Sequence, residues 1–199
     1  MSLDKNEILV GTLDQEQTIG AVLWADKSAN PTLPTIEDMD VTEGYTGLGY
    51  LVEDSFSIDF GNESEIIKEH NLGAVRVVKT SGMSVITLTL MQTNADNMKV
   101  MVGDENVTEA AATREHGKRF RAAFGPGSIG KDGVLQIRLK DGDRAAVLCQ
   151  PNSHIQDFSE VEIDAKNAIG WECEFVGLSD GGSQESLFII YDDGEVVSA

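Results

Sequence analysis

The feature that most constrains the fold is a period-two alternation of apolar and polar residues, which recurs in short runs along the chain. The clearest run, residues 83–93, places isoleucine and leucine on one side of an extended strand and mainly threonine on the other. Glycine, aspartate and asparagine separate the runs, which is typical of turns. No strand–helix–strand rhythm is present. We therefore predict a mainly β fold, an antiparallel β-sandwich or barrel with one short α-helix and extended loop and terminal arms.

The expected strands follow from these runs. We expect residues 74–80 and 83–93 to pair as a hairpin through Ser81-Gly82, and residues 62–72 to be irregular, with a helical turn around 65–70. Residues 26–43 carry Pro31 and Pro34, which argues against a central strand there. Further turns are expected at Asp-Gly pairs, including 132–133 and 141–142. The other expected strands are 8–12, 19–25, 46–52, 118–124, 134–140, 144–150, 155–164, 169–178 and 187–191, with residues 56–60 either a strand or an extended loop.

One segment, residues 94–102, has the signature of a helix. Asn94 is a favourable N-cap, and Asp96 complements the helix dipole in the first turn. Gly103 can end the helix in a left-handed conformation. The face predicted to be buried consists of Ala95, Met98, Met101 and Val102.

The charge balance excludes several classes of partner. The 199 residues include 34 acidic and 15 basic side chains, which give a formal net charge of −19. Binding to nucleic-acid phosphates or to an anionic membrane needs clustered lysine and arginine, so neither is expected. The excess acid serves either solubility or a surface to which passing DNA does not adsorb.

The cysteines and the chain start bear on the compartment. Cys149 and Cys173 lie in apolar, strand-like runs, and we expect them to be buried free thiols. The first residues lack the basic and apolar regions of a signal peptide, and no apolar run reaches the length of a membrane helix. We therefore expect synthesis in a cytoplasm and no membrane partner.

No arrangement of residues indicates catalysis, a cofactor or a metal. Residues 125–130 match the spacing G-x-G-x-x-G, but a strand follows them where a dinucleotide site needs a helix. His70, His116 and His154 lack metal-ligand spacing with one another or with a cysteine. The acidic pairs have no calcium-loop spacing. We predict no catalytic, cofactor-binding or metal-binding residues, and hence no enzyme.

The order of segments from residue 44 to residue 108 is distinctive. GLGYLVED (47–54) is followed by a polar stretch, then VRVVKT (75–80), VITLTLMQTN (85–94) and VGDENVT (102–108). Together with IGAVLWA (19–25), this order resembles the major tail tube proteins of long-tailed, siphovirus-type bacteriophages. One position departs from the pattern, since Ser55 stands where glycine is common in that family.

The resemblance implies a single tail-tube domain over residues 1–199 that assembles into rings of six. The rings would stack into a tube through which DNA passes without specific binding, and a ring would carry a formal charge of about −114, which repels phosphates. It also implies a place in the virion tail after synthesis in the host bacterium, with the tape measure and tail terminator as further partners.

The resemblance further assigns surfaces to assembly. The regions expected to bridge rings are an N-terminal arm (1–14), a long loop (53–72) and a C-terminal arm (192–199). The threonine face of the clearest strand suits either the lumen or a subunit seam, which would also cover exposed sheet edges. The candidate residues are Glu53, Asp54, Phe56, Ile58, Phe60, Ile66 and Ile67 for the inter-ring loop, and Thr87, Thr89 and Thr93 for the lumen or seam face.

Other readings of the same pattern stay open from the sequence alone. A tube subunit of a contractile injection machine or a head–tail connector would share the β architecture. A soluble immunoglobulin-like binding module would instead be a stable monomer with a patch of exposed aromatic residues.

Overall fold

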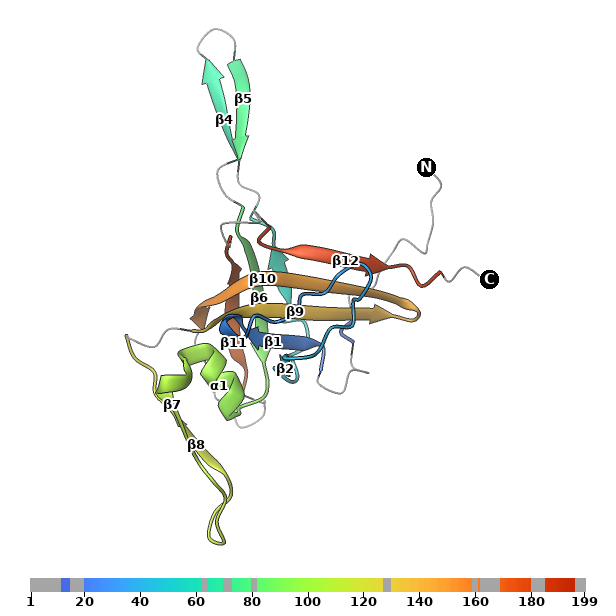
Figure 1. The fold of residues 1–199 in the computed structure, drawn as a ribbon. Coiled ribbons are helices and arrows are strands. Elements are labelled where there is room, and N and C mark those ends of the chain that lie inside the picture. The colour runs from blue at the N-terminus through green and yellow to red at the C-terminus, as the bar shows by residue number, and fades with distance from the viewer. Residues whose placement is uncertain are drawn as a thin grey trace.

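A computed structural model describes residues 12–14, 20–61, 64–69, 73–79, 82–126, 130–158, 161, 169–179 and 185–195. Antiparallel strands dominate these residues, as the alternation predicts, and Figure 1 shows their arrangement. The elements are β1 (Val22–Asp26), η2 (Lys27–Ala29), β2 (Thr46–Gly47), β3 (Ser57–Asp59), β4 (Ser64–Glu69), β5 (Gly73–Lys79), β6 (Ser84–Leu90), α1 (Ala95–Val102), η3 (Asp104–Asn106), β7 (Val107–Ala110), β8 (Arg119–Ala122), β9 (Asp132–Asp141), β10 (Arg144–Phe158), β11 (Trp171–Gly177) and β12 (Phe188–Asp192).

The main sheet follows the order β2-β1-β9-β10-β11-β6-β3, and β12 pairs with β10 off this path. Its end strands, β2 and β3, do not pair with each other in the described residues, so the sheet is an open, sandwich-like structure and not a closed barrel. The two halves of the sheet meet across the core, where the Trp24 ring of β1 lies 5.7 Å from the Phe175 ring of β11, centroid to centroid.

The long strand β10 belongs to both halves. Its first part pairs with β9 and β12, and its second part pairs with β11. The register with β9 shifts between Gln150 and Ser153, and Pro151, which has no N–H to donate, lies in that shift. The sequence predicts two strands here, 144–150 and 155–164. The structure has one strand to Phe158, because a bulge absorbs the proline.

The principal core lies between the sheet halves and α1. It contains the inward residues of β6, the buried face of the helix, and apolar residues of β1, β9, β10 and β11. The helix agrees with its prediction: Asn94 accepts a hydrogen bond from the Asn97 N–H at 2.8 Å. Gly103 ends the helix with a positive φ of 88°, although its ψ of 153° lies outside the left-handed helical region. The Asn97 amide also donates to the Leu48 and Gln92 carbonyls, which ties α1 to the residues that follow β2 and β6.

A second, smaller core lies on the other face of β1 and β9. Successive residues of β1 point to opposite faces, so Leu23 and Ala25 are buried there. The predicted loop that carries Pro31 and Pro34 covers this face. Arg138 of β9, which is 2% exposed, holds that loop by donating to the Met39 and Val41 carbonyls.

Two hairpins project from the body in opposite directions: β4–β5 and β7–β8 (Figure 1). The predicted pairing of residues 74–80 with 83–93 is therefore wrong. β5 pairs with β4, and β6 pairs with β11 and β3, because long-range partners bury the apolar face of β6. The helical turn predicted around 65–70 is also wrong, since Ser64–Glu69 is a strand. Ser81 and His70 lie outside the described residues.

The two Asp-Gly turns have different outcomes. Asp141-Gly142 connects β9 to β10, with Gly142 at a φ of 64°. Asp132-Gly133 is not a turn, because it begins β9 and pairs with β10. A β-carbon at Gly133 would come within 2.3 Å of the Trp24 ring, so this glycine permits close packing of β9 on β1.

Candidate assembly surfaces

Thr87 and Thr89 lie on the outward side of β6, opposite the buried isoleucine and leucines. The strand register places Thr87 between Ser57 of β3 and Glu174 of β11. Thr89 pairs with Glu172 in the same way. These cross-strand pairs share one face of the sheet, so the threonines stand beside carboxylates.

Further carboxylates extend this surface. Asp157 of β10 pairs with Glu174, and Asp59 of β3 pairs with Val85 of β6. No lysine or arginine occurs in β3, β6, β11 or residues 153–158. We call this surface the acidic face, and its polar residues are Ser57, Asp59, Thr87, Thr89, Asp157, Glu172 and Glu174.

Thr93 does not belong to this strand face. It follows the end of β6 and is exposed, and its hydroxyl accepts a hydrogen bond of 2.9 Å from the Trp171 indole. The Trp171 ring in turn stacks on Phe124, with 6.1 Å between the centroids. The three threonines predicted together are thus two sheet residues and one residue of an aromatic cluster.

The predicted inter-ring residues divide into three groups. Glu53 and Asp54 form an exposed turn, with Asp54 at a φ of 58°. Phe56 and Ile58 are half-buried against the principal core, while Phe60 is 49% exposed. Ile66 and Ile67 lie in β4, and their side chains are outside the described residues.

Much of the predicted loop 53–72 is extended chain. Residues 51–59 run along the edge of β6: Leu51 bridges Leu90, the Val52 N–H donates to the Thr89 carbonyl, and β3 follows. Residues 64–69 form one strand of the projecting hairpin β4–β5. Among its described residues, only 64–69 project from the body (Figure 1).

The predicted terminal arms are described only in part. Residues 12–14 lie along β9, where Leu13 bridges Leu139. Asp192 ends β12, and residues 193–195 follow it. Residues 1–11 and 196–199 lie outside the described part of the chain.

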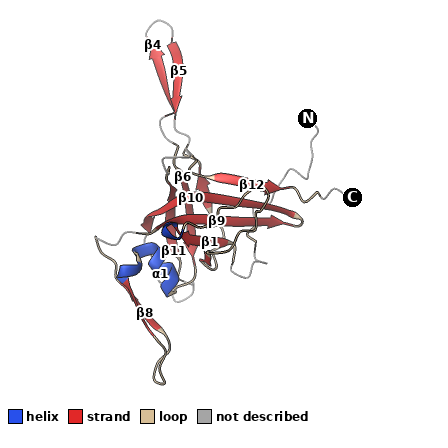
Figure 2. Ribbon diagram, in the orientation of Figure 1, coloured by secondary structure: helices blue, strands red, loops and turns tan. Residues whose placement is uncertain are grey.

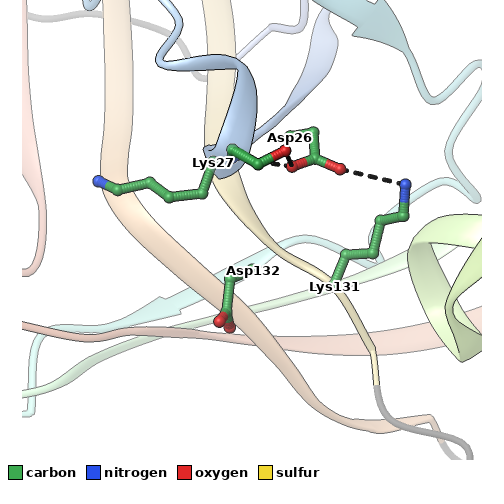
Figure 3. Close-up of a pocket in the computed structure, with 5 residues that line it drawn as sticks. Asp26, Lys27, Lys131 and Asp132 are labelled. Carbon is green, nitrogen blue, oxygen red and sulfur yellow. Dashed lines mark hydrogen bonds and ion pairs between the residues drawn. The ribbon is translucent and has the colours of Figure 1, made fainter.

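A shallow pocket of about 400 Å³ lies beside η2 and the start of β9 (Figure 3). Lys131 reaches Asp26 at 3.2 Å and also pairs with Asp104 at 2.6 Å. Burial opposes the charge of Lys131, but the two carboxylates raise its pKa overall. Lys27 points away from this pair and donates to the Pro151 carbonyl. These contacts tie β1, η3 and β9 together.

The remaining reactive groups have structural surroundings. Cys149 and Cys173 are buried free thiols, as predicted, and burial raises the pKa of each to about 12. The His154 ring contacts the Asp132 carboxylate at 2.7 Å. Among the described residues, no group of three histidine, cysteine, aspartate or glutamate side chains could hold a metal ion.

The sequence missed the partners of the threonines. Glu172 and Glu174 alternate with apolar residues in WECEF, a period-two signal that could have placed them on the polar face of a strand. Their position beside β6 depends on long-range pairing, which no local pattern contains.

The fold and these surfaces define an antiparallel β protein with projecting hairpins and an acidic sheet face. The sequence model of the family described as phage tail tube protein matches residues 1–198. The chain therefore belongs to the phage tail tube proteins, which are structural proteins of the virion tail. No curated protein matches the chain. None of the helices in the described residues has the length and apolar character needed to cross a membrane.

Proposed function

We propose that six copies of this chain form a ring, that the rings stack into the tube of a long, non-contractile tail, and that the acidic face lines the channel for DNA. The observation that carries the proposal is the composition of that face: it has four carboxylates and two threonines, and β3, β6, β11 and residues 153–158 contain no lysine or arginine.

The chemistry of the acidic face suits a DNA channel. Carboxylates around a narrow channel repel phosphates, and the low dielectric of the surrounding wall focuses that field. Threonine hydroxyls keep the wall hydrated between the charges. The described strand segments of this face contain no lysine or arginine that could bind phosphates, so DNA slides along them without adsorbing.

The position of the acidic face also fits assembly. Its opposite side packs on the principal core, so this half of the sheet can present carboxylates to a channel without losing buried contacts. The hairpin β4–β5 extends from the connection between β3 and β6, and β7–β8 extends on the opposite side of the body, so both can reach neighbouring subunits (Figure 1). The tape measure would occupy the channel before DNA, and the tail terminator would close the tube at its end.

A charge reversal on the acidic face tests the channel assignment. Phage particles would carry either Glu172→Lys with Glu174→Lys or, as a matched control, Glu43→Lys with Glu105→Lys, which are exposed residues off this face. We expect both variants to form tails. DNA ejection should slow at least tenfold only in the first, because the new cations bind phosphates. Equal ejection rates for the two variants would refute the assignment.

A further inference from the structure

The hairpin β7–β8 is basic, although the chain as a whole is strongly acidic. Residues 107–122 contain four of the 15 lysines and arginines but only two of the 34 acidic residues. The hairpin therefore has a formal charge of +2, which leaves −21 on the rest of the chain. Such a local reversal of sign favours contact with an acidic surface.

One face of this hairpin is held by its own subunit. Val107 is buried, and Glu109 lies between Lys99 of α1 and Lys118. Figure 2 shows α1 beside the base of the hairpin. The hydrogen bonds from Lys118 and Lys99 lower the pKa of Glu109 to about 2, so this carboxylate stays charged in its contact with the helix.

The other face of the hairpin has no contact of this kind. The register pairs Arg121 with Thr108 and Arg119 with Ala110, which places two arginines and two small residues on one side. All four residues are exposed. Neither guanidinium group has an ion pair with another residue in the described part of the chain. A two-stranded hairpin with an open face is marginally stable in water, which favours a partner that covers it.

A groove of complementary chemistry lies beside β12. It has a volume of about 350 Å³ and contains both apolar and acidic side chains. Ile36 at its rim is 84% exposed, and Tyr191 is 43% exposed. β12 pairs with β10 on one side and with no described strand on the other. The groove is lined by Ile36, Met39, Ile190, Tyr191, Asp192 and Asp193.

The hairpin cannot reach the groove of its own subunit. In Figure 1 the hairpin β7–β8 extends below α1, while β12 lies on the opposite side of the body. A contact between them must therefore join two copies of the chain through different surfaces. Such a heterologous contact repeats from copy to copy and produces closed rings or extended stacks.

We propose that the outer face of β7–β8 in one subunit docks on the β12 groove of a second copy, where Arg119 and Arg121 pair with Asp192 and Asp193. Guanidinium groups form paired hydrogen bonds with carboxylates, and the aliphatic arms of the arginines cover apolar residues of the groove. This inference depends on the proposed self-assembly and assigns it a specific contact.

Charge reversal and charge exchange test this contact in the full-length protein. Sedimentation would measure the concentration at which assembly begins. The double variant Arg119→Glu with Arg121→Glu should raise this concentration at least tenfold, because like charges then meet at the contact. The double variant Asp192→Lys with Asp193→Lys should raise it equally, for the same reason. Mixing the two variants should restore assembly, since each supplies the partner that the other lacks. Arg119→Lys with Arg121→Lys keeps the charge but loses the paired hydrogen bonds, so it should raise this concentration by less than the charge reversal does.

The outcomes separate this contact from the proposed function. If the unchanged chain never assembles, self-assembly itself fails. If it assembles but the arginine variant does so equally well, the hairpin contact is refuted. If only the arginine variant fails and mixing does not rescue it, the groove is not the partner. Binding of DNA by the unchanged chain that the arginine variant loses would also overturn the proposal, in favour of a nucleic-acid contact.

Discussion

Single buried side chains hold parts of this molecule that its strands do not. Arg138 is the clearest case, because it is charged, nearly inaccessible and directed at a loop without regular structure. It donates to two carbonyls and contacts Asp40 at 3.2 Å, and Tyr45 holds the same loop by donating to the Thr32 carbonyl. The loop over the second core is thus fixed by side-chain donors.

Replacement of this arginine should be costly. We expect Arg138→Met to lower the free energy of unfolding by about 2 kcal/mol, because the Met39 and Val41 carbonyls lose their donor. Chemical denaturation would measure the change. Asp40→Asn is the control. The Asp40 side chain is 87% exposed, so this variant should change the free energy of unfolding by no more than about 0.5 kcal/mol. A small effect of Arg138→Met would mean that water replaces the arginine.

The buried thiols should make the protein less stable at alkaline pH. Burial raises the pKa of Cys149 and Cys173 from 9.0 to about 12, so the folded state keeps protons that the unfolded state loses. Stability is therefore fully present below pH 9 and falls between pH 9 and 12, by at most about 1.4 kcal/mol per pH unit for each thiol. Denaturation at several pH values should show that Cys173→Ala reduces this slope, and an unchanged slope would contradict the burial argument.

At the scale of elements, the local sequence predicted individual helices and strands better than it predicted which strands pair. The helix was predictable because Asn94, its cap, and its apolar spacing are local features. Most strands were predictable from alternation, but β4 and β7 were not. The partners of β6 were not, because the choice between β5 and β11 depends on which pairing buries more apolar surface. For the same reason, the sequence predicted that Thr87 lies on the polar side of its strand but did not predict that Glu174 lies beside it.

The helix cap should contribute measurably to stability. Asn94→Ala removes the acceptor of the Asn97 N–H, and we expect a loss of about 1 kcal/mol in the free energy of unfolding. Asn94→Asp keeps an acceptor oxygen and should lose little. If both variants behave alike, the cap hydrogen bond does not stabilise α1.

The ion-pair contact of Glu109 in β7–β8 with Lys99 of α1 should weaken in acid. The folded pKa of Glu109 lies at about 2, below its ordinary value of 4.5, so its contribution is present above pH 4.5 and is lost as the pH falls towards 2. NMR chemical shifts of the hairpin amides should follow this loss. Glu109→Gln should remove the pH dependence, and a persistent transition in that variant would assign it to another group.

At the scale of the whole molecule, charge is distributed unevenly. The described strand segments of the acidic face carry carboxylates and no lysine or arginine, while one projecting hairpin carries a cluster of arginines. The net charge of the sequence predicts that the protein does not bind DNA. It could not reveal how the charges are distributed over the surface, because that depends on the pairing of distant strands. In the proposed assembly, the subunit attracts its copies at one surface and repels DNA at another.

The central claim is that this subunit assembles with itself into a tube. Electron microscopy of the purified, concentrated full-length protein tests it most directly. We expect rings with six-fold symmetry and stacks of such rings with an open central channel. A protein that stays monomeric at every concentration, with neither rings nor tubes in the micrographs, would contradict it.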